Sequence, residues 1–199
     1  LLSFPTVVLR FSDAYGAPGG QAVVAVTLET NEPLTGMQFR IQPQDDGDPT
    51  ELVQFLGAIS HVAHFGFDVT SSTDENGVTS ILLINFSSAT ALPPGETTVL
   101  ELFFDIDENT PTDREFTLSV TENLLTDADV ESRVHNVETG LIRTGRPGDP
   151  SLDGVVNILD IAKVVRYILN ILPTPTGFEL FVADANGDQE LDVRDAISM

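Results

Sequence analysis

The stretch Asp149-Pro-Ser-Leu-Asp-Gly-Val-Val-Asn-Ile-Leu-Asp160 has a counterpart further along the chain, Asp184-Ala-Asn-Gly-Asp-Gln-Glu-Leu-Asp-Val-Arg-Asp195. In both stretches, side chains that carry oxygen stand at positions 1, 3, 5, 9 and 12. A hard divalent cation such as Ca²⁺ takes about six to eight oxygen ligands, and this spacing wraps a single loop around one ion. The repeat therefore predicts two calcium-binding loops, each followed by the start of a helix.

The expected ligands follow from these positions, with position 7 contributing its backbone carbonyl and position 12 both carboxylate oxygens. In the first loop they are Asp149, Ser151, Asp153, Val155, Asn157 and Asp160, and in the second they are Asp184, Asn186, Asp188, Glu190, Asp192 and Asp195. Gln189 takes the place where glycine normally permits a sharp turn, so we expect the second site to be weaker or distorted. Solvated acidic turns are the alternative, but they do not explain the same five positions twice.

The residues after the first loop show the spacing of an amphipathic helix. Apolar residues recur at steps of three and four as Ile158, Ile161, Ala162, Val165, Ile168, Leu169 and Leu172, and they predict one apolar face. Thr144-Gly145-Arg146-Pro147-Gly148 is typical of a linker. We therefore expect a domain at residues 1–143, a linker at 144–148, and a calcium-binding domain at 149–199 whose second helix is short.

Residues 1–143 indicate an all-β domain. Strand-length apolar runs alternate with turn signals, as in Val24, Val26 and Leu28 set against Ala25 and Thr27. The expected strands are Val7–Phe11, Ala22–Glu29, Met37–Gln42, Phe65–Thr70, Ser80–Phe86, Thr98–Ile106, Phe116–Thr121 and Val137–Ile142. About nine short strands without long helical patterns predict a β-sandwich.

Composition excludes several functions. The chain has 199 residues, 31 of them acidic and 9 basic, with a formal net charge of −22. Binding to nucleic acid or to an anionic membrane needs clustered basic residues, and no such cluster exists. The absence of cysteine excludes disulfides and thiolate zinc sites. A chain that begins at Leu1 fits an exported product whose signal has been removed, so we expect an extracellular or cell-surface protein.

Residues 148–199 resemble a dockerin, the calcium-binding module that plugs into cohesins in cellulosome-type assemblies. The matching residues are Gly148-Asp149, Asp153-Gly154, Val156-Asn157-Ile158, Asp160, the helix 164–169, Ala183-Asp184, Asn186-Gly187-Asp188 and Asp195-Ala196. The resemblance implies two half EF-hands. It also implies that positions 10 and 11 choose the partner, which here are Ile158, Leu159, Val193 and Arg194.

The sandwich resembles a cohesin, a nine-stranded jelly-roll-like module. The matching segments are Gly19-Gly20-Gln21 with Val23–Leu28, Gly36–Ile41, Leu52-Val53, Ile84–Ser87, Pro94-Gly95, Leu100–Phe104 and Val137–Ile142. An immunoglobulin-like or carbohydrate-binding sandwich shares several of these patterns.

Other candidate sites are less well supported. His61, His64 and His135 form no metal-binding spacing with acidic residues, so we interpret them as ordinary surface or core histidines. Paired carboxylates could serve a glycosidase, but a chain without Trp and with only two Tyr offers a poor platform for sugars. Asn85-Phe86-Ser87 matches an N-glycosylation sequon. We expect no catalytic activity.

The leading hypothesis is non-catalytic attachment between proteins outside the cell. The calcium-ordered plug of one copy would enter the sandwich of the next, and a head-to-tail contact that does not close builds a filament. Two alternatives stay open at this point. One is an adaptor that joins different dockerin- and cohesin-bearing proteins, and the other is a carbohydrate-binding module with a calcium-stabilised tail.

Overall fold

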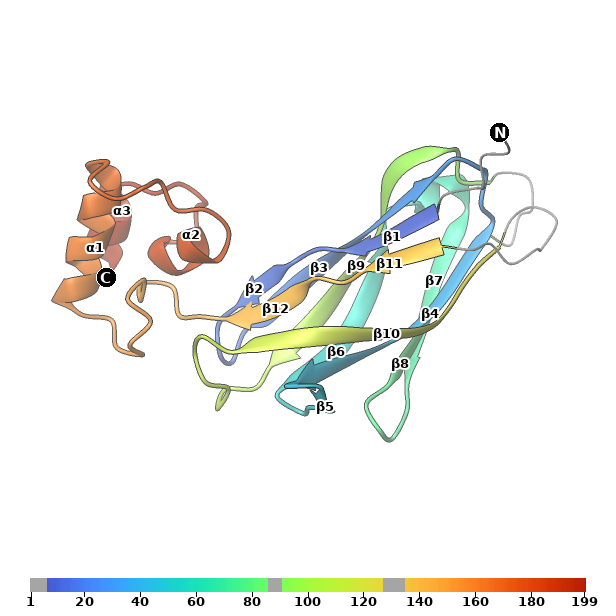
Figure 1. Ribbon diagram of the computed structural model, residues 1–199, viewed down its shortest axis with the longest axis horizontal. Helices are drawn as coiled ribbons and strands as arrows, with labels where there is room; N and C mark the ends of the chain where they lie inside the picture. The colour runs from blue at the N-terminus through green and yellow to red at the C-terminus, as the bar shows by residue number, and fades with distance from the viewer. Residues whose placement is uncertain (1–6, 86–90, 127–134) are drawn as a thin grey trace. The chain divides into compact units, whose positions relative to one another are not determined.

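The computed structural model describes residues 7–85, 91–126 and 135–199, and its first part is a β-sandwich (Figure 1). The strands are β1 (Val7–Phe11), β2 (Ala14–Gly16), β3 (Gln21–Thr30), β4 (Gly36–Asp45), β5 (Asp48–Pro49), β6 (Val53–Ser60), β7 (Phe67–Thr73), β8 (Thr79–Asn85), β9 (Gly95–Ile106), β10 (Glu115–Thr126), β11 (His135–Glu138) and β12 (Leu141–Thr144). A 3₁₀ turn, η1 (Ala63–Phe65), precedes β7. The expected fold class is confirmed.

Two sheets form the sandwich. The first has the strand order β11-β1-β3-β9-β6, and the second has the order β2-β12-β10-β4-β8-β7 with β5 paired to β4. In the first sheet β1 pairs antiparallel with β3, with Leu9 opposite Leu28, and parallel with β11, with Leu9 opposite Val137. In the second sheet β4 pairs antiparallel with β8, with Phe39 opposite Ile81.

Alternation along the strands fills the space between the sheets. In β3 the side chains of Ala22, Val24, Val26 and Leu28 are buried, and the residues between them are wholly or partly exposed. The largest side chains of the core include Phe39 and Phe104, which are fully buried. Phe39 meets Phe11 of the other sheet edge to face, with ring centroids 5.3 Å apart. Burial of each such side chain contributes about 2–3 kcal/mol.

Two expectations about strands need correction. The run Val137–Ile142 is two strands, β11 and β12, which belong to different sheets. The chain crosses between the sheets at Gly140, where an added Cβ would lie 2.4 Å from the backbone of Ser12, so a side chain does not fit. Strand β6 was not expected, because its sequence Val-Gln-Phe-Leu-Gly-Ala-Ile-Ser lacks a clean alternation, and Leu56 and Ile59 are exposed.

The C-terminal part contains three helices, α1 (Ile158–Ile168), α2 (Phe178–Ala183) and α3 (Val193–Ser198). Its core consists of Val164, Tyr167 and Ala183, packed against Ile168, Leu172, Leu191, Ala196 and Met199. The residues of α1 that face this core differ from the expected apolar face. Val164 and Tyr167, which the spacing did not include, are buried, whereas Ile158 and Leu169 of the expected face are exposed.

The chain divides into two compact units. One contains most of the sandwich, and the other joins Arg143–Met199 to two sandwich segments, Tyr15–Gln21 and Ile106–Glu115. The expected domain boundaries, with a linker at 144–148, stay a prediction. Among the described residues, none of the helices has the length and apolar character that crossing a membrane requires.

Candidate metal centre

The first acidic loop is closed by two buried carboxylates that bind its own backbone. Asp149 accepts hydrogen bonds from the amides of Asp153 (3.3 Å) and Gly154 (2.8 Å). Asp160 accepts hydrogen bonds from the amides of Ser151 (3.1 Å) and Asn157 (2.9 Å). Aspartate favours such local bonds over regular secondary structure, and here they turn the chain around a common centre.

The loop ends in the N-terminus of α1. Asn157 is the N-cap and accepts a hydrogen bond from the amide of Leu159, while the Asp160 carboxylate returns to the Asn157 amide. This capping box satisfies amides that the first turn of a helix leaves free. It also fixes the carboxylate of position 12 at the mouth of the loop, so the helix start holds that carboxylate in place.

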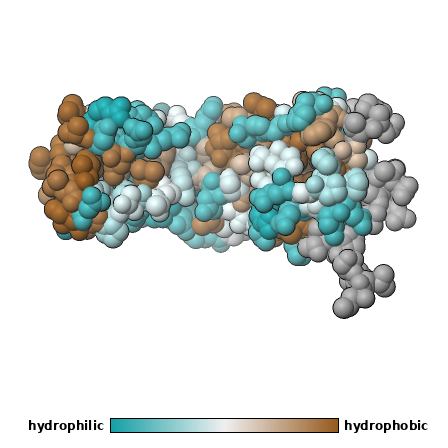
Figure 2. Space-filling view, turned by 90° about the horizontal axis from the view of Figure 1, so that it is seen from above, coloured by the Kyte–Doolittle hydropathy of each residue, from teal (hydrophilic) through white to brown (hydrophobic). Residues whose placement is uncertain are grey.

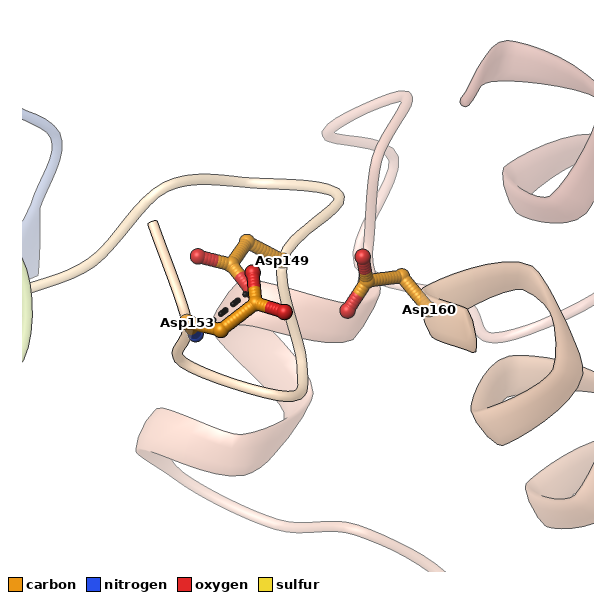
Figure 3. A group of neighbouring side chains, drawn as sticks. All are labelled: Asp149, Asp153 and Asp160. Atoms are coloured by element: carbon orange, nitrogen blue, oxygen red, sulfur yellow. Dashed lines mark hydrogen bonds between the residues drawn. The ribbon is translucent and has the colours of Figure 1, made fainter. Parts of the chain in front are cut away.

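Three carboxylates of the loop lie together, as Figure 3 shows. Oxygen atoms of Asp149, Asp153 and Asp160 lie within 4.8 Å of one another. Asp149 and Asp153 come from the loop, and Asp160 comes from the first turn of α1. Three negative charges at this distance repel one another, and oxygen donors of this kind suit a hard divalent cation. The donor set therefore fits Ca²⁺.

Asp160 is held in its ionised form. Burial disfavours the charge, but hydrogen bonds from the Asn157 amide, from the side chain and amide of Ser151 and from its own amide outweigh burial, and together they lower its pKa below the ordinary value. An ionised carboxylate is the form that binds a metal ion.

The other predicted ligands of the first loop have different partners. The Ser151 hydroxyl donates to Asp149 at 3.2 Å. The Asn157 amide group donates to the Val155 carbonyl at 3.0 Å while its oxygen caps α1. The structure thus gathers three of the six predicted ligands, and the complete ligand set stays a prediction.

The second loop repeats the backbone hydrogen bonds of the first. Asp184 accepts from the amides of Asp188 (3.2 Å) and Gln189 (2.8 Å). Asp195 accepts from the amides of Asn186 (3.3 Å) and Asp192 (2.9 Å), and Asp192 caps α3 within a capping box. The internal repeat of the sequence is therefore a repeat of conformation.

Both loops have left-handed residues at positions 4 and 6. They are Leu152 (φ 61°) and Gly154 (φ 84°) in the first loop, and Gly187 (φ 76°) and Gln189 (φ 67°) in the second. The strain expected at Gln189 is present, because a side chain disfavours positive φ. The loop keeps its hydrogen bonds all the same, and Leu152 carries an equivalent strain that the sequence did not reveal.

Arg194 lies over the carboxylates of the second loop. The guanidinium makes ion pairs with Asp188, Glu190 and Asp192. Its side-chain hydrogen bond is the main reason that the pKa of Asp192 lies below its usual value. The sequence placed Arg194 on the partner-binding face, so this contact with the loop was missed.

The other residues of the expected partner face point to solvent. Ile158, Leu159 and Val193 are 71%, 65% and 62% exposed. In Figure 2 apolar side chains gather where α1 lies, at the left of the view. A contiguous exposed apolar patch is typical of surfaces that bind a partner, and the partner-binding role of these residues stays a prediction.

The histidines do not form a metal site in the described part of the chain. His61 lies 3.3 Å from Glu101, and the ring of His64 packs against Phe65. Neither belongs to a group of three close metal-binding side chains among the described residues. The side chain of His135 lies outside the described residues.

The predicted glycosylation sequon has an enclosed asparagine. Asn85 is 8% exposed, and its amide nitrogen donates to the Phe65 carbonyl at 2.9 Å. This nitrogen is the atom that a glycan would join. Phe86 and Ser87 lie outside the described residues.

The comparisons with known proteins agree with this arrangement. Residues 147–199 match the family model of the dockerin type I domain. A search of curated proteins found no match. The solved structures similar to this chain include many cohesins and cohesin–dockerin complexes.

Three solved structures illustrate the likeness. CaCohA2 from Clostridium acetobutylicum is 19% identical with a TM-score of 0.56, and the match covers 70% of this chain and 91% of that one. The sixth cohesin of scaffoldin B from Acetivibrio cellulolyticus, solved with a Cel5 dockerin, is 14% identical with a TM-score of 0.57, and 70% and 99% are covered. A non-cellulosomal cohesin from Archaeoglobus fulgidus is 10% identical with a TM-score of 0.54, and 71% and 91% are covered.

At these identities the likeness establishes the fold of the sandwich, and the family model establishes the nature of the C-terminal segment. The chain thus combines a cohesin-like β-sandwich with a C-terminal dockerin type I segment at residues 147–199.

Proposed function

We propose that this chain is a non-catalytic attachment protein whose dockerin segment docks into the cohesin-like sandwich of the next copy. Cohesins and dockerins are structural modules, and their similarity to this chain supports protein–protein attachment of the cellulosome type. The observation that carries the proposal is the presence of both complementary modules in one chain. A contact between them repeats head to tail, and a contact that does not close builds a filament.

Calcium would order the plug in this proposal. Dockerin domains bind Ca²⁺, and the residues that would hold it in the first loop are Asp149, Asp153 and Asp160, with the remaining predicted ligands around them. The ion supplies positive charge that offsets the repulsion of these carboxylates. Asp149 and Asp160 also bind the loop amides, so they link metal binding to the loop conformation and to the start of α1.

The docking face of the plug would be apolar. Ile158 and Val193 occupy position 10 of the two loops, and Leu159 follows Ile158 at position 11. All three are more than half exposed. Burial of each side chain against a partner contributes about 1.5–3 kcal/mol, which is enough to make them the main anchors of a contact.

The sandwich offers a matching apolar surface on its first sheet. Val23 on β3 is 41% exposed, and Leu56 and Ile59 on β6 are 53% and 54% exposed. Val53 and Phe55 of β6 face the core, so Leu56 points to the outer face, as Val23 does between the buried Ala22 and Val24. Strand β9 lies between β3 and β6, so Val23 and Leu56 belong to one region of the sheet. We propose this outer face, defined by Val23 and Leu56, as the socket; Ile59, three residues after Leu56, has the opposite orientation. The match in chemistry between plug and socket favours docking between copies.

The proposal locates the assembly outside the cell or at its surface, as is typical of cohesin–dockerin assemblies. Negative-stain imaging of the pure chain, with Ca²⁺ and with EGTA, tests it. We expect concentration-dependent filaments in Ca²⁺ that EGTA dissolves. A chain that stays monomeric in Ca²⁺ contradicts self-docking and favours the adaptor. Binding to glucan or chitin by a monomeric chain favours the carbohydrate-binding alternative.

A further inference from the structure

The guanidinium of Arg194 occupies the centre of a small acidic cluster in the second loop. Its Nη1 lies 2.9 Å from Asp188, and its Nη2 lies 2.7 Å from Asp192 and 3.1 Å from Glu190. Its Nε also donates to both carboxylate oxygens of Asp192, at 3.1 and 2.9 Å. One side chain therefore bridges three acidic residues of the same loop.

Two of these carboxylates are predicted metal ligands, at positions 5 and 9 of the loop. One oxygen of Asp188 accepts the Glu190 amide at 3.0 Å, and the other faces Arg194. Both oxygens of Asp192 bond to Arg194, through the side chain and, at 2.7 Å, through the backbone amide. The carboxylate oxygens left free by the backbone thus face a cation that belongs to the chain.

The first loop lacks such a cation. The residue at the equivalent position 11 is Leu159, whose amide bonds to Asn157 as the Arg194 amide bonds to Asp192. In the described part of the chain, no basic side chain forms an ion pair with Asp149, Asp153 or Asp160. Two basic side chains that contact this loop, Arg146 and Lys163, bond to the backbone carbonyls of Gly154 and Pro150 instead.

The arrangement of carboxylates differs accordingly. Oxygen atoms of Asp149, Asp153 and Asp160 converge within 4.8 Å, and this is the one convergent group of three acidic or histidine side chains among the described residues. The equivalent residues of the second loop, Asp184, Asp188 and Asp195, do not converge in this way, although their backbone bonds match. The Asp188 carboxylate is engaged with Arg194 instead.

We infer that Arg194 is a built-in competitor of Ca²⁺ in the second loop. It neutralises Asp188, Glu190 and Asp192 when the loop holds no metal, and it must leave Asp188 and Asp192 before they bind an ion. The inference rests on the proposed function in that it assumes a calcium-binding dockerin segment. Its consequence is that the order of the first loop depends more strongly on Ca²⁺ than the order of the second loop, which Arg194 partly supports without metal, and that the second loop binds Ca²⁺ more weakly.

Hydrogen exchange read by mass spectrometry tests this inference on the full chain. Peptides covering 149–160 and 184–195 report the two loops separately while Ca²⁺ is titrated, at a chain concentration at which light scattering shows monomer. For Arg194→Gln, which keeps a polar side chain but shortens it and removes its charge, we expect the Ca²⁺ midpoint of 184–195 to fall about tenfold. The midpoint of 149–160 should stay within about twofold, because Arg194 does not contact that loop.

Two further variants serve as matched controls. Arg194→Lys keeps the charge but loses the fork of donors that bridges the three carboxylates, so its second midpoint should lie between those of the wild type and Arg194→Gln. Leu159→Arg places a cation at position 11 of the first loop. The counterpart of Asp188 in this loop is Asp153, which is ionisable, but the counterpart of Asp192 is Asn157, which is not. We expect it to raise the first midpoint by about threefold. In EGTA, 184–195 should exchange faster in Arg194→Gln than in the wild type, a change that needs no bound metal to be seen.

The outcomes separate this inference from the proposed function. If both loops take up Ca²⁺ and Arg194→Gln leaves the second midpoint unchanged or raises it, the inference is wrong and the calcium-ordered plug stands. If neither loop gains protection in millimolar Ca²⁺, both are wrong. If the tenfold shift is seen but the chain forms no filaments, the inference holds and self-docking fails.

Discussion

In the first loop Asp149 accepts hydrogen bonds from the amides of positions 5 and 6, and in the second loop Asp184 does the same at matching distances. The two loops therefore share the same pattern of hydrogen bonds to the backbone. Their charges differ, because position 11 is Leu159 in one and Arg194 in the other. The comparison teaches that hydrogen bonds to the backbone fix the conformation of each loop. The residue at position 11 then decides whether the positive charge that offsets the carboxylates comes from the chain itself or from a bound ion.

The largest expected effect is the loss of the buried carboxylate of the first loop. Asp160→Ala removes hydrogen bonds to the amides of Ser151 and Asn157, together with one expected metal ligand. We expect residues 149–172 to unfold with a loss of about 3 kcal/mol or more, and assembly to disappear. Circular dichroism and hydrogen exchange measure the first effect, and negative-stain imaging measures the second.

The control for this change is Glu179→Ala, which removes an exposed acidic side chain of α2 that lies outside both loops. It should leave folding and assembly unaltered. Assembly that persists in Asp160→Ala while the first loop holds no metal would show that calcium does not order the plug.

Removal of calcium should separate the two parts of the chain. Compared with Ca²⁺ at a hundred times its dissociation constant, EGTA should lower the free energy of unfolding of residues 147–199 by about 2.7 kcal/mol. The unfolding transition of these residues therefore shifts to a lower temperature. The sandwich has its own core of buried residues such as Phe39 and Phe104, so its transition should stay in place. Differential scanning calorimetry resolves the two transitions. Equal shifts of both would argue against two separately stabilised parts.

The docking face gives the next effect in size. Ile158→Asp puts a charge where we expect an apolar contact. It should weaken docking by tenfold or more, because that fold-change corresponds to the free energy of burying about one apolar side chain. Ile171→Asp is the matched control, because Ile171 is also exposed, at 61%, but lies outside positions 10 and 11 of the loops. Sedimentation velocity measures docking. Equal losses in both variants would mean that the face is wrongly assigned.

The smallest effect concerns the left-handed residue at position 6. Gln189→Gly should stabilise the second loop by about 0.5 kcal/mol, because glycine accepts positive φ but loses more freedom on folding. Gly154→Gln in the first loop should destabilise it by about 1 kcal/mol. A Cβ at Gly154 would contact nothing within 4 Å, so this cost is conformational and not steric. Chemical denaturation with EGTA present measures both changes, and the same sign in both loops would contradict the comparison.

Much of the fold is predictable where one face of an element is buried. The alternation in β3 predicts that Val24, Val26 and Leu28 point inward, and all three are buried. Strand β6 is not predicted, because Leu56 and Ile59 are exposed and its sequence therefore shows no clear alternation of apolar and polar residues. Helix α1 is apolar on more than one side, so spacing predicts a helix but cannot say which side packs against Ala183 and which stays exposed.

The site shows the same limit. Spacing predicts both loops and a helix start after each. The structure places these starts at the N-caps Asn157 and Asp192, each within a capping box formed by residues close in sequence. The direction of a long side chain is not encoded in this way. Arg194 follows Val193, and the resemblance to dockerins placed both on the partner-binding face. The guanidinium instead reaches back over the loop, because three acidic residues lie within its reach there.

The central claim is that plug and socket on different copies fit each other. Two variants of the full chain test it: one with a damaged plug, Ile158→Asp with Val193→Asp, and one with a damaged socket, Leu56→Asp. By sedimentation velocity in Ca²⁺, each variant alone should be monomeric. A mixture of the two should form a 1:1 complex, because one intact plug meets one intact socket, and EGTA should dissociate that complex. Filaments from either variant alone, or no complex in the mixture, would contradict the account.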